Sequence, residues 1–237
     1  PDPQDLSNGS QFKVGIEVEK NSIMGYECSG EYIGEYDLFK GFETDGSCGV
    51  EAITEILPLD DIDSDNEKKV FELFDDAEEI INEEEVDSRC GGHMTVSCSD
   101  SFSYFKEKGS QEYGDFYREY ISQSKVLREK VRINSSILYA MYRYRLTNRY
   151  CKNDKDLTRK HSYGYHEDRY TPVLEKDNGT IEFRLFSRIK NVEQLKLRYR
   201  LLYKLMDYSV NKDASYSVFL LSVMPILKEM YSGDEQK

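Results

Sequence analysis

The segment from residue 12 to residue 19 alternates strictly between apolar and polar residues, and this alternation limits the fold more than any other feature of the chain. The apolar set is Phe12, Val14, Ile16 and Val18, and the polar set is Lys13, Gly15, Glu17 and Glu19. A period of two indicates a β-strand with one face in a core and the other face turned away from it. The chain therefore contains a half-buried strand whose second face carries two glutamates.

Three further segments, residues 50–57, 89–97 and 180–186, alternate in the same way. Alternate side chains of a strand share a face and lie ~7 Å apart. The non-apolar faces of the four strands carry Glu17, Glu19, Glu51, Glu55, His93, Glu182 and Arg184. The first of the three segments is expected to end at Pro58, because proline cannot donate to a sheet ladder.

Other segments predict helices. Ser64 and Glu67 form a capping box, so a helix is expected to begin at Ser64. Helical periodicity also marks residues 115–150, 192–208 and 217–231. Strands clustered early, with helices inserted and appended, predict an α+β domain in which helices pack on one face of a mainly antiparallel sheet. The division expected is a flexible leader at residues 1–11 and a single domain at residues 12–237.

The charge distribution bears on possible partners. A net charge of -13 argues against nucleic acid, because nucleic-acid binders carry basic faces. Residues 60–87 hold fourteen acids against two lysines, whereas residues 125–160 hold eleven Lys and Arg against three acids. The basic segment either faces an anion such as a nucleotide or complements the acidic helix. Charge alone favours the second interpretation.

Apolar runs and cysteines bear on the compartment. Runs such as residues 218–221 are far shorter than the ~20 residues of a membrane span, so no membrane partner is expected. Five cysteines at irregular spacings do not form a closed disulfide framework, which favours reduced thiols and a cytoplasmic location. The sequence leaves open whether the chain forms a homo-oligomer or joins a larger assembly.

The glutamates of the four strands point to a metal. A solvated sheet face also carries polar residues, and for any one strand this is the default interpretation. Like charges directly across neighbouring strands are destabilising, however, so a set this rich in carboxylates favours a cation. Oxygen ligands suit Mg²⁺ or Mn²⁺, and an added imidazole leans towards Mn²⁺.

The ordered motifs resemble the amidoligase family, carboxylate–amine ligases that share the fold of glutamine synthetase and are related to glutamate–cysteine ligase. The resemblance runs from about residue 14 to residue 189. Its pieces are Gly15–Glu19, Asp45–Ser47, Glu51 running into Leu57–Leu59, Cys90–His93, Arg149–Cys151, Arg169–Tyr170 and Thr180–Arg184. It implies a glutamine-synthetase-like catalytic domain.

The resemblance also implies roles for single residues. The metal ligands would be Glu17, Glu19, Glu51, His93 and Glu182, holding two or three Mg²⁺ or Mn²⁺ ions against the phosphates of ATP. Arg184 would neutralise the transferred phosphoryl group, with Arg169 as a second arginine. The cofactor and substrate side would involve Arg149, Asp45 and Ser47. Glu55 stands where the family usually has proline, so it is either an added catalytic or metal-binding group or a sign of a slipped alignment.

The function implied is ATP- and Mg²⁺-dependent amide formation through an acyl phosphate, with small-molecule or peptide carboxylates and amines as substrates. The alternative is a catalytically inactive protein of the same fold that serves as a binding or structural component. Three lesser possibilities stay open but are disfavoured. They are a zinc site at Cys90, His93 and Cys98, a nucleophilic Cys48, and base stacking by the tyrosines of residues 139–150. His161 and His166 are expected at the surface or against substrate.

Overall fold

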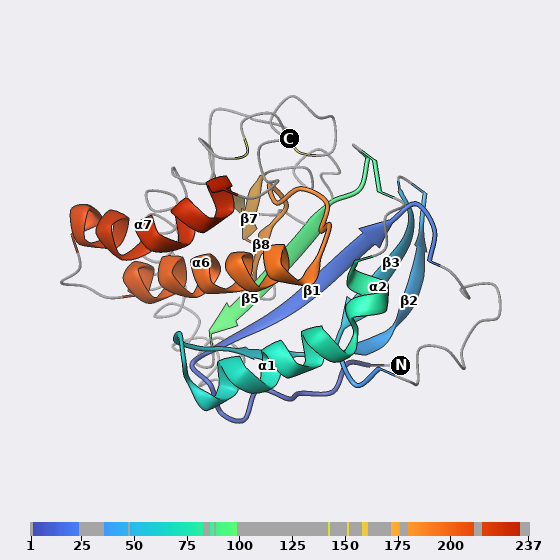
Figure 1. Cartoon of the computed structure of the whole chain (residues 1–237), viewed down its shortest axis with the longest axis horizontal. Coiled ribbons are helices and arrows are strands. Elements are labelled where there is room, and N and C mark those ends of the chain that lie inside the picture. Colours follow the sequence, from blue (N-terminus) through green and yellow to red (C-terminus); the bar gives the residue numbers. More distant parts are fainter. Residues whose placement is uncertain are drawn as a thin grey trace, which may run out of the picture.

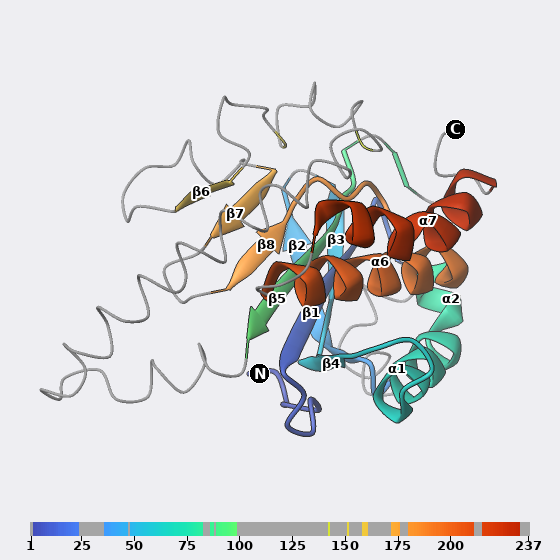
Figure 2. The same ribbon diagram turned by 90° about the vertical axis from the view of Figure 1, so that its left-hand side faces the viewer.

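Strand β1 (Phe12–Lys20) lies inside a mainly antiparallel sheet that organises the computed structural model. The structure describes residues 2–23, 36–46, 48–82, 86–87, 89–98, 142, 151, 158–160, 172–175, 180–210 and 215–232. Within these residues the path across the sheet is β2, β3, β1, β5, β8, β7, β6, and β4 pairs with β1 beside β3 (Figures 1 and 2). The other strands are β2 (Phe39–Asp45), β3 (Gly49–Thr54), β4 (Leu57–Leu59), β5 (Gly92–Cys98), β6 (Thr158–Lys160), β7 (Val173–Glu175) and β8 (Ile181–Phe183). All described pairings between these strands are antiparallel except that of β6 with β7, and an isolated bridge between Asp5 and Ile56 is also parallel.

The helices gather on one face of this sheet, as Figures 1 and 2 show from two directions. They are α1 (Asp65–Asp76), α2 (Glu78–Ile81), α6 (Val192–Val210) and α7 (Tyr216–Ser232). The apolar set of β1 is at most 1% exposed, and it shares the core with Leu195 and Leu202 of α6. The predicted α+β architecture, with helices on one face of a mainly antiparallel sheet, is therefore confirmed.

The start of α1 uses the predicted capping residues. The hydroxyl of Ser64 accepts a hydrogen bond from the backbone N–H of Glu67 at 3.0 Å. The Glu67 carboxylate accepts one from the backbone N–H of Asp63, also at 3.0 Å, so the return bond reaches one residue further than in the usual box. The helix thus begins where the sequence predicts.

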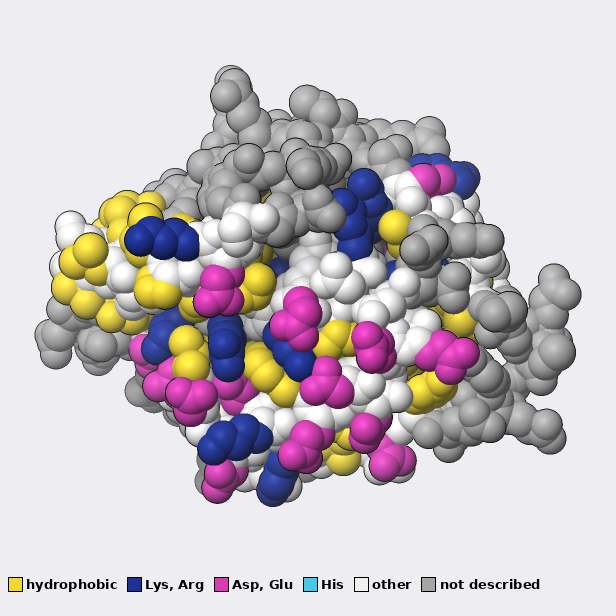
Figure 3. Space-filling view, in the orientation of Figure 1, with side chains coloured by type: hydrophobic (Ala, Val, Ile, Leu, Met, Phe, Trp, Pro, Cys, Tyr) yellow, Lys and Arg dark blue, Asp and Glu magenta, His cyan; other side chains and the backbone are white. Residues whose placement is uncertain are grey.

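Ion pairs connect α1 and the chain before it to α6. Lys196 contacts Asp75 at 2.7 Å, and Lys204 contacts Asp61 at 2.9 Å. Between them, Arg200 holds the buried Glu67 with two hydrogen bonds of 3.0 and 2.9 Å. Figure 3 shows the mixture of acidic and basic side chains on this face. Basic residues of α6 thus complement part of the acidic segment, whereas the basic segment 125–160 lies largely outside the described residues.

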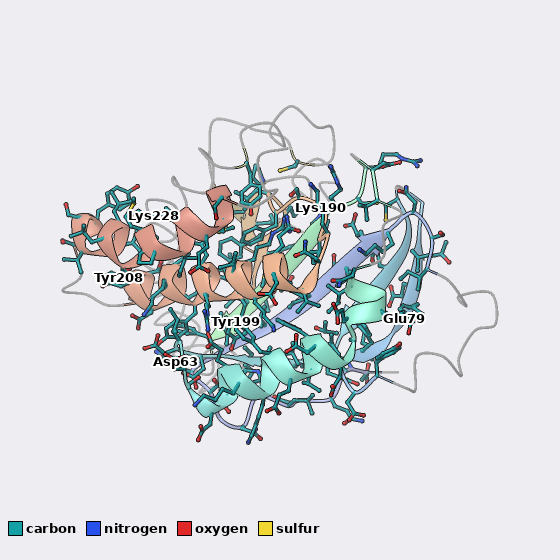
Figure 4. The ribbon with its side chains drawn as sticks, in the orientation of Figure 1. Asp63, Glu79, Lys190, Tyr199, Tyr208 and Lys228 are labelled. Atoms are coloured by element: carbon teal, nitrogen blue, oxygen red, sulfur yellow. The ribbon has the colours of Figure 1, made fainter. Side chains whose placement is uncertain are left out.

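Tyr199 of α6 ties the helix layer to the chain that follows β4. It is labelled in Figure 4, where it lies between α6 and α1. Its hydroxyl donates to the carbonyl of Pro58 at 2.8 Å and accepts from the backbone N–H of Asp60 at 2.9 Å. Burial raises the pKa of Tyr199, so the phenol stays neutral.

Two predictions about the sheet are wrong. Residues 50–57 are not one strand, because β3 ends at Thr54 and the chain resumes as β4, with Pro58 inside it. Residues 4–6 are not a loose leader. The N–H of Leu6 donates to the carbonyl of Ile56 at 2.8 Å, and the N–H of Ile56 donates to that of Gln4 at 2.9 Å. The break after β3 gives the N-terminal segment a pairing partner.

The remaining element predictions differ in outcome. The strand at residues 89–97 corresponds to β5, and that at residues 180–186 to the shorter β8. The last two predicted helices are α6 and α7. Of the helix predicted at residues 115–150, only Tyr142 is described; it is buried and packs edge-on against Phe186, as a core residue would. Within the described part of the chain, no helix is long and apolar enough to cross a bilayer.

Candidate metal centre

Five of the predicted site residues meet on the sheet as two overlapping groups. Glu17, His93 and Glu182 form one group, and each offers a ligand atom within 4.8 Å of the others. Glu17, Glu19 and Glu51 form the second group by the same measure. Glu17 belongs to both, so the two groups adjoin.

Strand register explains the meeting. In an antiparallel pair, directly opposite residues project from the same face of the sheet. Glu19 of β1 lies opposite Glu51 of β3, and Glu17 lies opposite His93 of β5. Glu182 of β8 lies opposite Thr95, two residues along β5 from His93. Four strands thus deliver these side chains to one area, on the face opposite to the apolar set of β1.

His93 lies among the carboxylates. Its Nδ1 is 2.9 Å from Glu17 Oε2, 3.2 Å from Glu19 Oε1 and 3.9 Å from Glu182 Oε1. Burial lowers the pKa of His93, and Arg184 lowers it further, but Glu19 and Glu17 outweigh both and leave the pKa above its ordinary value. The metal-free site therefore holds a proton on His93 more tightly than a free imidazole would, and a metal ion would have to displace that proton before taking the nitrogen as a ligand.

Arg184 contacts the same group from the end of β8. Its Nη1 donates to Glu182 Oε1 at 2.6 Å. The Glu182 side chain is 3% exposed and that of Arg184 is 18% exposed. A charge-assisted hydrogen bond of this length fixes the guanidinium beside the candidate metal ligands.

Gly91 shapes the centre, although sequence reasoning treated it only as part of a motif. Its backbone N–H donates to Glu19 Oε2 at 2.6 Å. A Cβ at this position would lie 2.7 Å from His93 Nε2 and 3.1 Å from Glu19 Oε1. Any larger residue would displace the imidazole, so Gly91 holds one ligand and leaves room for another. Its place two residues before His93 is the only sequence signal for this role.

Glu43 extends the acidic row and was also missed. It lies on β2 directly opposite Glu51, which itself lies opposite Glu19. Glu43 is exposed and contacts Lys40 at 3.8 Å. Like charges opposed across strands are unfavourable, so this row adds to the demand for cations. The short motifs around residues 23–45 gave no clear alternation from which its face could be read.

Glu55 does not belong to either group. One oxygen of its carboxylate accepts a hydrogen bond from the backbone N–H of Gln4, and its own N–H donates to the carbonyl of Leu38 at 2.9 Å. The role suggested for it, as a catalytic or metal-binding group, is therefore not supported. Its side chain instead helps to hold the N-terminal segment, because the alternation of β3 is broken at this position.

The structure does not describe the side chains of the other predicted site residues. Asp45 ends β2 opposite Gly49, and its side chain lies outside the described atoms. Ser47, Arg149 and Arg169 lie outside the described residues, as do His161 and His166. Neither candidate metal group of the described residues includes a cysteine, so nothing there favours the zinc alternative.

Comparison of the chain with protein-family models, with curated proteins and with solved structures gave no match. The chemistry of the donor set therefore carries the functional argument. Four carboxylates meet here, and His93 with Arg184 can offset two of their charges. Oxygen ligands of this kind fit Mg²⁺ or Mn²⁺, and a carboxylate shared between two groups suits two neighbouring ions.

Proposed function

We propose that the chain is an ATP- and Mg²⁺-dependent carboxylate–amine ligase with a glutamine-synthetase-like fold. The observation that supports the proposal most is the convergence of Glu17, Glu19, Glu51, His93 and Glu182, from four strands, into two groups that share Glu17. The sequence pattern alone predicts these five residues as ligands. Scattered solvated glutamates on a sheet face would not be expected to form two groups of three that share one residue.

The proposed metal positions follow from the two groups. Glu17, His93 and Glu182 would hold one ion, and Glu17, Glu19 and Glu51 would hold the other. When bound, Mg²⁺–ATP supplies the phosphoryl group that turns a carboxylate into an acyl phosphate open to an amine. The N–H of Gly91 keeps Glu19 oriented, so this ligand is already in place before an ion arrives.

Arg184 is the proposed stabiliser of transferred charge. The Glu182 carboxylate fixes one Nη atom, and the arginine lies at the edge of the first metal group. A fixed cation beside developing negative charge needs no reorganisation during the reaction, which is the condition under which it lowers a barrier. Arg184 would thus act on the phosphoryl oxygens, while Glu182 would both bind metal and hold the Arg184 guanidinium in position.

The test is ATP turnover with Mg²⁺ or Mn²⁺ in the presence of mixed amino acids and amines, followed as ADP release and as new amide products. Glu17→Gln and Glu182→Gln are expected to lower the rate by about 10²-fold or more, since each loses a metal-binding charge at a centre that stabilises the transferred phosphoryl group. Glu72→Gln is the matched control, because Glu72 is an exposed glutamate of α1 and belongs to neither group. Equal rates in all four proteins would refute the ligase assignment.

A second candidate, a non-catalytic protein of this fold, is favoured by one observation. The guanidinium of Arg184, paired with Glu182, offsets part of the carboxylate charge without metal. A proton on His93, whose pKa is raised, would offset more of it. Calorimetry separates the two candidates. Binding of Mn²⁺ and an ATP analogue by the wild-type chain supports the ligase, whereas no heat with either, together with a stable oligomer, supports the non-catalytic protein.

A further inference from the structure

The chain between β8 and α6 accepts hydrogen bonds from two fully buried cations. Arg198 of α6 donates from Nη1 to the carbonyl of Ser187 at 2.5 Å. Its Nη2 donates to the Ser187 hydroxyl at 3.0 Å and to the carbonyl of Arg188 at 3.2 Å. Lys20, the last residue of β1, donates from Nζ to the carbonyl of Ile189 at 2.8 Å. Both cations are 0% exposed, so positive side chains hold three successive carbonyls inside the core.

Each cation has a second support. The Arg198 guanidinium lies 5.6 Å from the ring centroid of Phe186 and 5.7 Å from that of Tyr142. Lys20 also donates to the carbonyl of Ile81, the last residue of α2, at 2.7 Å. Figure 1 shows the ends of β1 and α2 beside the start of α6. A charge is tolerated in a core only with such hydrogen bonds, which are stronger than those of neutral donors. The chain between β8 and α6 is therefore fixed by β1, α2 and α6 together.

The backbone at the start of β5 lies directly on this fixed chain. Gly91 pairs with Ser187 through an isolated antiparallel bridge. A Cβ on Gly92 would lie 2.7 Å from the carbonyl oxygen of Ser187 and 3.0 Å from Arg198 Nη1. No side chain fits at Gly92 without displacing one of these groups. The two glycines are thus held against Ser187 and against the cation that binds it.

The position of Gly91 matters because its N–H holds the candidate metal ligand Glu19, with a hydrogen bond of 2.6 Å to Oε2. The described pairing of β1 with β5 ends one residue before this pair, so the ladder does not fix it. Glu19 is instead followed by the anchored Lys20, and Gly91 is bridged to Ser187. Residues 187–189 are therefore a common support for both partners of the hydrogen bond.

We propose that Lys20 and Arg198 are positioning residues of the second metal group, which contains Glu19. By fixing the chain between β8 and α6, they keep the Gly91 N–H on Glu19 and hold this carboxylate in place for an ion. This role rests on the proposed function, because it takes the carboxylates to be metal ligands. The first group needs the support less, since the register of β1, β5 and β8 places its three members.

The test is a Mn²⁺ titration of the full chain, followed by electron paramagnetic resonance, with one metal group intact at a time. Glu182→Gln leaves only the second group intact, and Glu51→Gln leaves only the first. Added to Glu182→Gln, Lys20→Met and Arg198→Lys are each expected to weaken Mn²⁺ binding by about tenfold, a typical cost of losing a residue that orients a metal ligand. Added to Glu51→Gln, neither change is expected to alter the affinity.

Tyr199→Phe is the matched control. Tyr199 is also buried on α6, and this variant loses two hydrogen bonds, but to the chain around β4. Urea unfolding with chelator shows whether each protein folds and how much stability it has lost. Should neither Lys20→Met nor Arg198→Lys fold, Ser187→Ala takes their place, because it removes only the hydroxyl acceptor of Arg198. It is expected to weaken the second group in the same direction by a smaller factor.

The results separate this role from general stability and from the proposed function. Weaker binding in the Glu182→Gln background alone supports the positioning role. Equal weakening in both backgrounds, or equal weakening by Tyr199→Phe, assigns the effect to lost stability and overturns it. Unchanged affinity in the variants that fold, including Ser187→Ala, overturns it as well while wild type still binds Mn²⁺. If wild type binds no Mn²⁺, the proposed function fails and the positioning role fails with it.

Discussion

The ring of His93 brings proton binding and metal binding into competition at one nitrogen. Three carboxylates surround Nδ1, and although burial lowers the pKa of His93, two of them, Glu19 and Glu17, hold it above its ordinary value. A proton at this nitrogen and an ion at the same place exclude each other. The protonation of one residue therefore controls both the stability of the metal-free chain and its affinity for metal.

The pH dependence follows from this shift. A group whose pKa is raised by folding stabilises the folded state fully below its unfolded value, 6.5 for histidine, and loses that contribution as pH rises through the folded pKa. With chelator present, the free energy of unfolding is expected to fall as pH rises above 6.5, and His93→Gln should flatten that part of the curve. Urea unfolding at a series of pH values measures it, and parallel curves for the two proteins would contradict the expectation.

Gly91 provides a second test at a single residue. In Gly91→Ala the new Cβ would contact His93 Nε2 at 2.7 Å, so the ring must move and the first metal group must distort. Mn²⁺ affinity is expected to fall by about tenfold or more. The matched control is Gly41→Ala on β2, where no described atom lies within 4 Å of the new Cβ. Isothermal titration calorimetry compares the Mn²⁺ affinities of the two variants. An unchanged affinity in Gly91→Ala would show that Gly91 does not shape the metal centre.

Among the elements, α1 depends on α6 as much as on its own cap. Glu67 is almost fully buried, yet its carboxylate is satisfied on two sides, by Arg200 and by the N–H of Asp63. A buried carboxylate is tolerated only when it is paired and hydrogen-bonded in this way. One side chain therefore joins the start of α1 to the middle of α6.

The cap can be tested separately from that junction. Ser64→Ala removes the acceptor for the Glu67 N–H and is expected to cost about 1 kcal/mol of unfolding free energy. Glu72→Ala, an exposed change on the same helix, is expected to stay within about 0.5 kcal/mol. Urea denaturation gives both values, and equal effects would show that the cap does not limit stability.

The elements that sequence predicts well are those whose signals are local. The alternation of β1 needs no partner strand to be read, and the Ser64–Glu67 cap is complete within four residues. Glu55 could not be assigned correctly, because the chain leaves β3 at Thr54 and the period of two loses its phase there. The role of Gly91 depends on the register between β1 and β5, and no pattern within either segment specifies that register.

For the whole molecule, the N-terminal segment counts as part of the sheet. Deleting residues 1–7 removes two backbone hydrogen bonds with Ile56, the bond to the Glu55 carboxylate and the Asp5–Lys13 pair. At about 1 kcal/mol for each backbone hydrogen bond, the expected loss of unfolding free energy is about 2–3 kcal/mol. Chemical denaturation of the shortened chain measures it. A loss below about 0.5 kcal/mol would mean that the segment does not contribute in solution.

Metal stoichiometry tests the centre as a whole. Because Glu17 belongs to both groups, Glu17→Gln is expected to abolish Mn²⁺ binding, whereas Glu51→Gln and Glu182→Gln should each leave one ion bound. In wild type, Mn²⁺ at a hundred times its dissociation constant should add about 2.7 kcal/mol of stability for each independent site. Titration followed by electron paramagnetic resonance counts the ions. Equal loss in all three variants would argue for a single position.

The position of β1, with partners along both edges, has a consequence for how the chain tolerates change in its length. One extra residue inserted directly after Val14 would reverse the facing of every later side chain of the strand. Glu17 and Glu19 would then face the apolar core, and Ile16 and Val18 would face away from it. A shift in pairing register could not compensate, because the strands on both edges of β1 require the same side chains to face the core. Single-residue insertions within β1 should therefore prevent folding, whereas surface loops, which have no alternating facing to keep, should tolerate them.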